Sequence, residues 1–212
     1  METDTDIEYA FSELSETAKQ NARDKYKFSG YPHHDWWNNV YEDANQIAKI
    51  LGLDIESPKV SRTGRNYTNI DISFSGFWSQ GDGACFKGYY RFNPEAVNVL
   101  NFEGCIDEEL IRIATELTVM QTTQRLKGCE FFSATICQSG SYSHSNTMTF
   151  DIHDFATDEV GEVDENQFGQ LMCDFADWIY KTLEAQHDYL TSDEVVDERL
   201  AEEKFDVDGV CL

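Results

Sequence analysis

The chain has few basic residues: 16 Lys and Arg stand against 40 Asp and Glu over 212 residues, which gives a formal net charge of −24. Binding to nucleic acid or to an anionic membrane depends on Lys and Arg for the phosphate contacts, so this balance argues against both partners. It favours partners that carry positive charge. We therefore expect no direct binding to DNA or RNA and no membrane association.

Long apolar runs are missing as well. No stretch approaches the roughly 18 apolar residues of a membrane helix. The N-terminus METDTDIEYA has neither the basic n-region nor the apolar h-region of a secretory signal. The six cysteines include no C-x-x-C pair, and we interpret them as reduced, mostly buried thiols in a reducing cytoplasm.

Material for a core is plentiful. Hydrophobic residues make up 41% of the chain, and 14 Phe, 10 Tyr and 4 Trp are among them, which excludes global disorder. The length fits one domain of ordinary size. We expect an acidic N-terminal leader over 1–10, a single α+β domain over 11–190, and an acidic C-terminal helix and tail over 191–212.

Two periodicities alternate along the chain. Apolar side chains at helical spacing predict four main helices, over 14–26, 37–51, 107–128 and 164–183. Alternating apolar and polar residues predict two hairpins, one from strands over 68–75 and 85–92 and one from strands over 132–136 and 148–152. This order predicts an α+β fold in which four main helices pack on one face of an antiparallel sheet built from the two hairpins.

The negative charge is concentrated at the C-terminal end. Residues 151–212 hold 19 acidic side chains against Lys181, Arg199 and Lys204, so they carry −16 of the −24. Such a segment is either a solvated face or a contact surface for a basic partner. The candidate acidic contact residues are Asp174, Asp177, Glu184, Asp188, Asp193, Glu194, Asp197 and Glu198. Lys181 interrupts their row on the predicted fourth helix, which weakens close mimicry of a nucleic acid.

The segment 75–86 is rich in glycine and aromatic residues. It lacks the Lys-Ser/Thr pair of a phosphate-binding P-loop and opens no predicted helix. One interpretation is a turn with positive φ at Asp82-Gly83, with Phe77 and Trp78 folded back over the core. The alternative is a recognition surface for a protein or a small polar ligand. Its candidate residues are Phe77, Trp78, Ser79, Gln80 and Asp82.

Trp36 and the histidines are two further candidates for a functional site. Trp37 continues the apolar stripe of the predicted second helix, whereas Trp36 points about 100° away and is either an aromatic interface anchor or packed under the preceding loop. The histidines, including the adjacent pair His33 and His34, do not follow the spacing of a zinc site. We expect neither a metal nor a cofactor, and no catalytic residue is assigned.

Several sequence blocks carry a family resemblance. They are FSELS at 11–15, DWW at 35–37 with VYEDA at 40–44, FSGFWSQGDGACF at 74–86, and YLTSDE at 189–194. With these blocks the chain resembles a group of uncharacterised bacteriophage and prophage proteins, some loosely labelled as antitoxins. The resemblance implies expression in the cytoplasm of a bacterial host during phage or prophage activity. It transfers no catalytic residue.

The leading hypothesis is a phage-type accessory protein that acts without catalysis. It would bind a host or defence protein with a basic surface, as an inhibitor of a nucleic-acid-handling system in the manner of an anti-CRISPR protein or a DNA mimic. One alternative is an antitoxin that neutralises a toxin by direct binding. The other is an enzyme that binds a small polar ligand at the loop 75–86.

Overall fold

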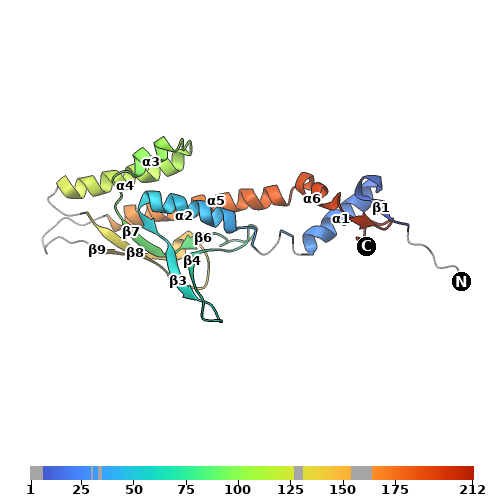
Figure 1. Ribbon diagram of the computed structural model, residues 1–212. Helices are drawn as coiled ribbons and strands as arrows, with labels where there is room; N and C mark the ends of the chain where they lie inside the picture. Colours follow the sequence, from blue (N-terminus) through green and yellow to red (C-terminus); the bar gives the residue numbers. More distant parts are fainter. Residues whose placement is uncertain (1–6, 30, 33–34, 127–130, 154–163) are drawn as a thin grey trace. The chain divides into compact units, whose positions relative to one another are not determined.

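The computed structural model describes residues 7–29, 31–32, 35–126, 131–153 and 164–212 (Figure 1). The fold is α+β, as the sequence predicted. Its contacts gather in two compact units: unit 1 joins 1–38 with 183–212, and unit 2 spans 39–182. These units do not follow the predicted boundaries, because the two ends of the chain belong to one unit instead of flanking a single domain.

A four-stranded antiparallel sheet forms the base of unit 2. In spatial order its strands are β2 (Leu53–Asp54), β7 (Gly88–Arg91), β8 (Ser133–Gln138) and β9 (Met148–His153). The register places Tyr90 of β7 opposite Ala134 of β8, and Ala134 opposite Ile152 of β9. The predicted hairpin over 132–152 is therefore confirmed as β8–β9.

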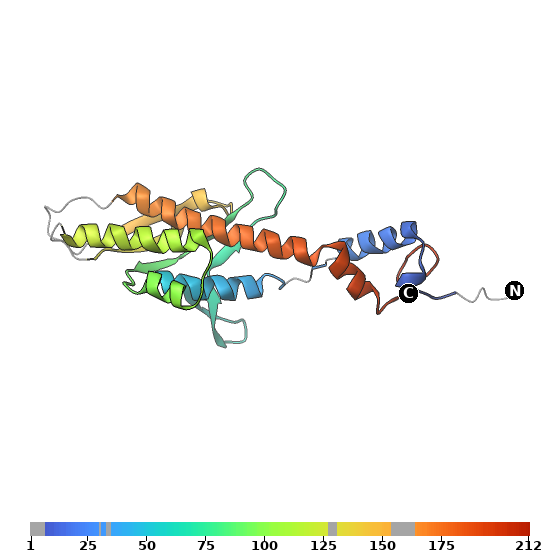
Figure 2. The same cartoon turned by 90° about the horizontal axis from the view of Figure 1, so that it is seen from above.

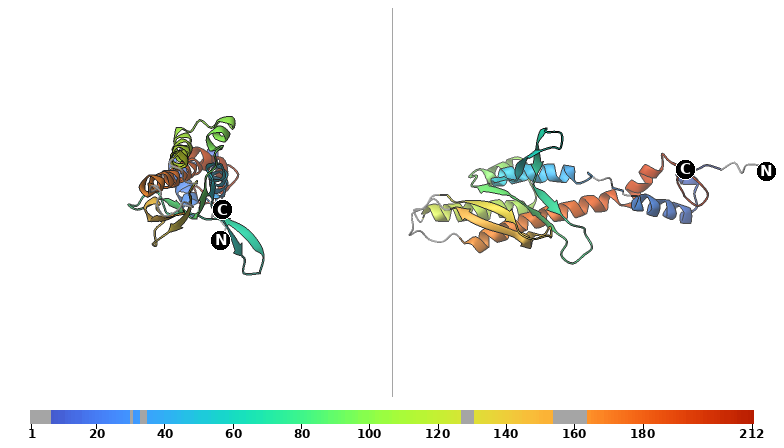
Figure 3. Two further views of the ribbon diagram at one scale, coloured as in Figure 1. Left: turned by 90° about the vertical axis from the view of Figure 1, so that its left-hand side faces the viewer. Right: turned by 90° about the horizontal axis from the view of Figure 1, so that it is seen from below.

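The other predicted hairpin is divided between two ladders. The segment 68–75 splits into β4 (Asn66–Ile70) and β5 (Ile72–Phe74), and 85–92 splits into β6 (Ala84–Phe86) and β7. Only β5 and β6 pair as a hairpin, because β7 pairs with β8 and β2 instead. A strand that was not predicted, β3 (Glu56–Val60), pairs with β4, and this ladder projects from the sheet (Figure 3).

Three long helices lie side by side over one face of the sheet (Figure 2). They are α2 (Asn38–Leu51), α4 (Glu108–Leu126) and α5 (Glu165–Leu190), the last of which belongs to unit 2 up to Thr182. The predicted cap at Asp107 is confirmed, since its Oδ1 accepts hydrogen bonds from the backbone N–H groups of Glu109 and Leu110. The short α3 (Ala96–Phe102) was not predicted.

Buried aromatic rings join the sheet of unit 2 to its helices. Tyr90, fully buried on β7, packs at 5.1 Å between ring centroids against Phe168 of α5 and at 5.7 Å against Phe132. Gln121 of α4, also buried, exchanges hydrogen bonds with the backbone of Phe132. Because side chains alternate along a strand, the neighbours of Tyr90 on β7 face away from the helices.

Unit 1 is held together by both ends of the chain. The strand β1 (Tyr9–Ala10) pairs with β10 (Lys204–Phe205), and α1 (Glu16–Phe28) packs on α6 (Asp193–Leu200). The short 3₁₀ helix η1 (Phe11–Glu13) precedes α1. The core of unit 1 consists of Phe11, Leu14, Ala18, Ala22, Val196, Leu200 and Phe205. The acidic C-terminal segment is therefore an integral part of a folded core.

The cysteines are less buried than predicted. Of the five described, Cys85 is buried, Cys105 and Cys173 are half-buried, and Cys137 and Cys211 are exposed, so the expectation of mostly buried thiols was wrong. All five are free, while Cys129 lies outside the described residues. In the described part of the chain, no helix is both long enough and apolar enough to cross a membrane.

Candidate recognition site

The loop 75–86 is closed at its base by the β5–β6 hairpin. The register Phe74 to Ala84 ends the ladder, and one further hydrogen bond of 3.0 Å runs from the Ser75 N–H to the Gly83 carbonyl. The Ser75 hydroxyl accepts from the Gly83 N–H at 3.2 Å and donates to the carbonyl of Ser143 at 3.3 Å. The two ends of the loop are thus fixed to each other and to the neighbouring 139–147 segment.

The Asp82 carboxylate holds the tip of the loop. Its Oδ2 accepts hydrogen bonds from the backbone N–H groups of Trp78 at 3.0 Å and Ser79 at 2.7 Å, while its own N–H donates to the Ser79 carbonyl. The predicted turn exists, but the residue with positive φ is Gly81, at +98°, instead of Asp82 or Gly83. Asp82 therefore orders the backbone beneath the exposed tip.

Gly83 is required for a close approach rather than for its backbone angle. A Cβ at this position would lie 3.0 Å from His144 Cδ2 and 3.2 Å from His144 Cα. His144 in turn caps the short 3₁₀ helix η2 (Ser145–Thr147), because its Nδ1 accepts the Asn146 N–H at 3.0 Å. This histidine consequently has a structural role beside the loop.

The two aromatic residues of the loop point in different directions. Phe77 folds back as predicted: its ring stacks on Phe74 at 5.8 Å and contacts the Tyr180 ring of α5 at 5.5 Å. The Tyr180 hydroxyl also donates to the Gly76 carbonyl at 3.0 Å. The interpretation that placed Trp78 over the core is wrong, because 83% of its surface is exposed, as the alternative of a recognition surface requires. Phe77 already fills the space against Tyr180, so the next residue projects outward.

Two cysteines lie close to the loop, and both have raised pKa values. Burial raises the pKa of the Cys85 thiol, which keeps it protonated and unreactive. Burial, followed by the charges of Asp177 and Asp174, raises the pKa of Cys173 to about 11. Among the described residues no group of three or more His, Cys, Asp and Glu could hold a metal ion, and His33 and His34 lie outside them. The side chains of Trp78, Ser79 and Gln80 are exposed to solvent.

The acidic residues of α5 within unit 2 differ from each other. Asp174 is mostly covered and forms an ion pair with Arg112 of α4, which also binds Glu109 and Glu116 at 2.7 and 2.8 Å. Hydrogen bonds from Arg112 lower the pKa of Glu109. Asp177 is exposed to solvent. Only Asp177 of these two is therefore available to a partner without breaking an internal contact.

The six acidic candidates in unit 1 are also divided. Asp197 forms two hydrogen bonds with the Arg23 guanidinium, at 2.6 and 2.7 Å, and Asp193 binds Lys27 at 3.0 Å. These pairs connect α6 to α1 and lower the pKa of Asp193. The remaining four are half-buried or exposed: Glu184, Asp188, Glu194 and Glu198. The eight predicted residues thus belong to two units, and three of them pair with bases of the chain itself.

Trp36 packs within unit 1. It is half-buried, precedes α2, and places its ring 5.6 Å from that of His187 and 5.9 Å from that of Trp37. Trp36 therefore packs against aromatic rings of unit 1, and its role as an interface anchor stays a prediction.

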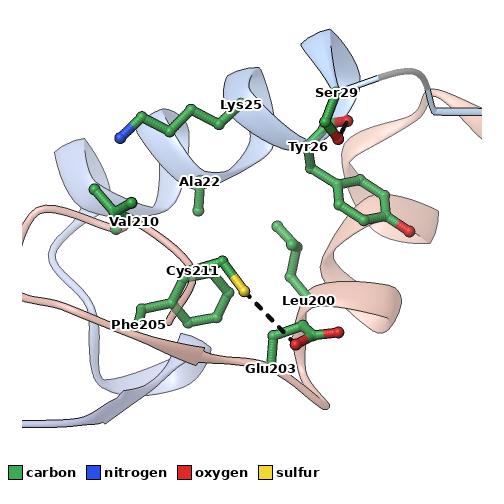
Figure 4. A pocket seen from close by; sticks show the side chains of 10 residues that line it. Ala22, Lys25, Tyr26, Ser29, Leu200, Glu203, Phe205, Val210 and Cys211 are labelled. Carbon is green, nitrogen blue, oxygen red and sulfur yellow. Dashed lines mark hydrogen bonds between the residues drawn. The ribbon is translucent and has the colours of Figure 1, made fainter.

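Unit 1 contains a pocket that the sequence did not indicate (Figure 4). Its volume is about 320 Å³, and its walls include the apolar side chains of Ala22, Leu200 and Phe205. At the rim the Cys211 thiol donates to the Glu203 carboxylate at 3.6 Å. Burial and the charge of Glu203 raise the pKa of Cys211, so this exposed thiol is a poor nucleophile. The pocket forms only where the C-terminal tail contacts α1, and no local sequence pattern indicates that contact.

A family model matches about three quarters of the 212-residue chain. The model is a domain of unknown function (DUF8835), and it covers residues 36–193. The chain belongs to this family. Comparisons with curated proteins and with solved structures return no match. The family match spans the whole of the loop 75–86 and its supporting residues, including Tyr180.

Proposed function

We propose that this member of the DUF8835 family is a phage-type accessory protein that acts without catalysis in the bacterial cytoplasm. It binds a host or defence protein with a basic surface and inhibits a system that handles nucleic acid. The contact is made by the loop 75–86 of unit 2, with Trp78 as its anchor. The observation that carries the proposal is that Trp78 is exposed on a loop whose backbone is fixed by Asp82 and by the packing of Phe77.

Preorganisation of this loop supports a binding role. The two amide contacts to Asp82 and the packing of Phe77 on Tyr180 fix the backbone on both sides of Trp78. A partner therefore meets an ordered surface, and little conformational entropy is lost when it binds. Tryptophan is among the side chains that contribute most to protein interfaces, because it buries a large area with few rotatable bonds.

Charge supports a basic partner. The net charge of −24 attracts a cationic surface over a long range and raises the rate of association. Asp177 adds an exposed carboxylate in the same unit as the loop. Because Asp174, Asp193 and Asp197 already pair with bases of this chain, we assign the specific contact to the loop and the steering to the remaining acidic surface.

The test uses the purified full-length protein to isolate its partner from bacterial lysate, followed by titration of the identified partner. Trp78→Ala should weaken binding by about 30-fold, which corresponds to roughly 2 kcal/mol for an interface hot spot. The matched control is Phe102→Ala, since Phe102 lies in unit 2 on α3 and is 93% exposed. This control should bind like wild type.

Salt separates the two contributions. Raising ionic strength to physiological values shortens the Debye length to about 8 Å and should slow association of wild type and Trp78→Ala alike. Equal affinity of Trp78→Ala and wild type would show that the loop is not the contact. A partner whose surface is acidic would contradict the proposed class of target.

A further inference from the structure

A second site lies in unit 2, where β7 and β8 meet the C-terminal end of α4. It is a pocket of about 470 Å³ whose lining includes Tyr89, Arg91, Arg125, Phe131 and Ser133. Tyr89 and Arg91 alternate with the buried Tyr90 on β7, so both lie on the face turned away from the helices. Arg91 is paired with Ser133 in the sheet register, and Arg125 reaches the pocket from the last turn of α4.

The two arginines of this pocket differ from the arginines that stabilise the fold. Arg23 and Arg112 bind carboxylates. Among the described residues, Arg91 and Arg125 form no ion pair within 4.0 Å. Both arginines line the same pocket without a carboxylate partner among the described residues, although the chain contains 40 acidic residues.

Each guanidinium group lies over an aromatic ring of the pocket. The Arg91 Cζ lies 5.9 Å from the centroid of the Tyr89 ring, and the Arg125 Cζ lies 5.7 Å from that of Phe131. The Tyr89 hydroxyl donates to Ser133 Oγ, which fixes the tyrosine ring. The pocket therefore combines preoriented cationic forks with apolar, planar walls.

We propose that this pocket binds a mononucleotide. Guanidinium groups recognise phosphate with paired hydrogen bonds, and aromatic rings and guanidinium planes stack on nucleobases. The pocket volume lies within the usual range of about 300–1,000 Å³ for small-ligand sites. This site is separate from the loop 75–86, and the proposal does not depend on partner binding there.

A free nucleotide and a nucleic acid strand present the same phosphate and base groups, but the protein's electrostatic field acts on them differently. The phosphate of a nucleoside monophosphate carries at most about two negative charges, and its strongest electrostatic contacts are with the two local arginines. A strand also meets the acidic surface that gives the protein its net charge of −24, and this repels a polyanion. We therefore assign the site to free mononucleotides and expect a single-stranded oligonucleotide to bind more weakly.

The experiment is calorimetric titration of the full-length protein with AMP and UMP, and with adenosine, inorganic phosphate and a single-stranded oligonucleotide. At least one mononucleotide should saturate one site and bind at least about tenfold more tightly than adenosine or phosphate alone. Absence of saturable mononucleotide binding to wild type would overturn the proposal. So would tighter binding of the oligonucleotide.

Variants locate the site. Arg125→Gln and Arg91→Gln should each weaken mononucleotide binding by about tenfold or more, because each removes a charge-assisted contact. The control is Arg62→Gln, which removes the same charge from an exposed arginine in the turn between β3 and β4. Thermal melts should show that all three variants are folded. Equal weakening by the control variant would overturn the assignment to this pocket.

Discussion

The helix α6 of unit 1 and the loop 75–86 of unit 2 use their polar side chains in opposite ways. On α6 the carboxylates of Asp193 and Asp197 bind Lys27 and Arg23 of α1, so part of the acidic segment holds a core together. In the loop, Asp82 is turned inward onto backbone amides, and the apolar Trp78 is presented to solvent.

This difference separates charge density from a binding surface. The density of acidic residues in the sequence predicts a binding surface at the C-terminus. Some of these carboxylates, however, form ion pairs with basic residues far away in the chain. A short aromatic loop carries less charge and is nevertheless the better candidate for specific contact, because its backbone is ordered before a partner arrives. In the proposed function, the acidic surface contributes long-range attraction to a basic partner.

The largest expected effect tests whether unit 1 is a cooperative unit of its own. Gly209 has φ +79°, and a Cβ there would lie 2.1 Å from the carbonyl oxygen of Ala18. Gly209→Ala should destabilise unit 1 by about 3 kcal/mol or more, through the clash and the strained backbone. Hydrogen exchange should accelerate in α1 and α6 and stay unchanged in β8 and β9.

The matched control for that change is Gly64→Ala. Gly64 has the same φ of +79° but no atom within 4 Å of the added Cβ, so it should cost only about 1 kcal/mol. Equal destabilisation by the two alanines would show that the contact between the C-terminal turn and α1 contributes nothing. Loss of protection throughout the chain in Gly209→Ala would show that the two units unfold together.

The next effect concerns the ordering of the loop. Asp82→Ala removes the acceptor of the Trp78 and Ser79 amides, so these amides should exchange faster and partner affinity should fall about tenfold. Global stability should fall by no more than about 1.5 kcal/mol. Asp82→Asn retains an acceptor oxygen and should fall between this variant and wild type. Unchanged affinity with accelerated exchange would contradict the role of preorganisation.

A smaller effect compares two adjacent acidic residues of α6. Asp197→Asn weakens the paired contact with Arg23 and should lower the free energy of unfolding by about 1 kcal/mol. Glu198→Gln changes an exposed side chain and should alter it by less than about 0.5 kcal/mol. Chemical denaturation measures both values. Equal values would remove the distinction between structural and free carboxylates on this helix.

The smallest expected effect is a dependence on acid that both units share. Hydrogen bonds from Arg112 lower the pKa of Glu109 in unit 2, and those from Lys27 lower that of Asp193 in unit 1. A depressed pKa contributes stability above the unfolded-state pKa values of 4.5 and 3.8, and this contribution is lost as the pH falls through the folded-state values.

Both groups are partly exposed, so each should contribute less than about 1 kcal/mol. Urea unfolding at pH 7 and at pH 3 should show lower stability in acid, and Glu109→Gln should reduce the difference. An unchanged difference in Glu109→Gln would contradict the assigned ion pair with Arg112.

Local periodicity was sufficient for the long elements of the fold. The apolar spacing predicted α1, α2, α4 and α5, and the Asp107 cap follows from residue type alone. The strands β1 and β10 have two residues each, which is too short for any alternation to be read. Their pairing depends on the two ends of the chain meeting, and that is a tertiary event.

The candidate site was predictable in place but not in orientation. The density of glycine and aromatic residues marked 75–86 as a special loop. The direction of Trp78 depends on Tyr180, whose hydroxyl contacts Gly76 across 104 positions of sequence. The pairing of Arg23 with Asp197 spans 174 positions, so the sequence alone could not show which carboxylates are free.

The central claim is that Trp78 touches the partner, and site-specific photo-crosslinking tests it most directly. The photoreactive residue p-benzoylphenylalanine replaces Trp78 in one full-length variant and Phe102 in the other, so that both variants carry the label on an exposed aromatic position of unit 2. After illumination in bacterial cells, the label at 78 should crosslink one basic protein, and the label at 102 should not. Crosslinking of that protein from 102 but not from 78 would contradict the account.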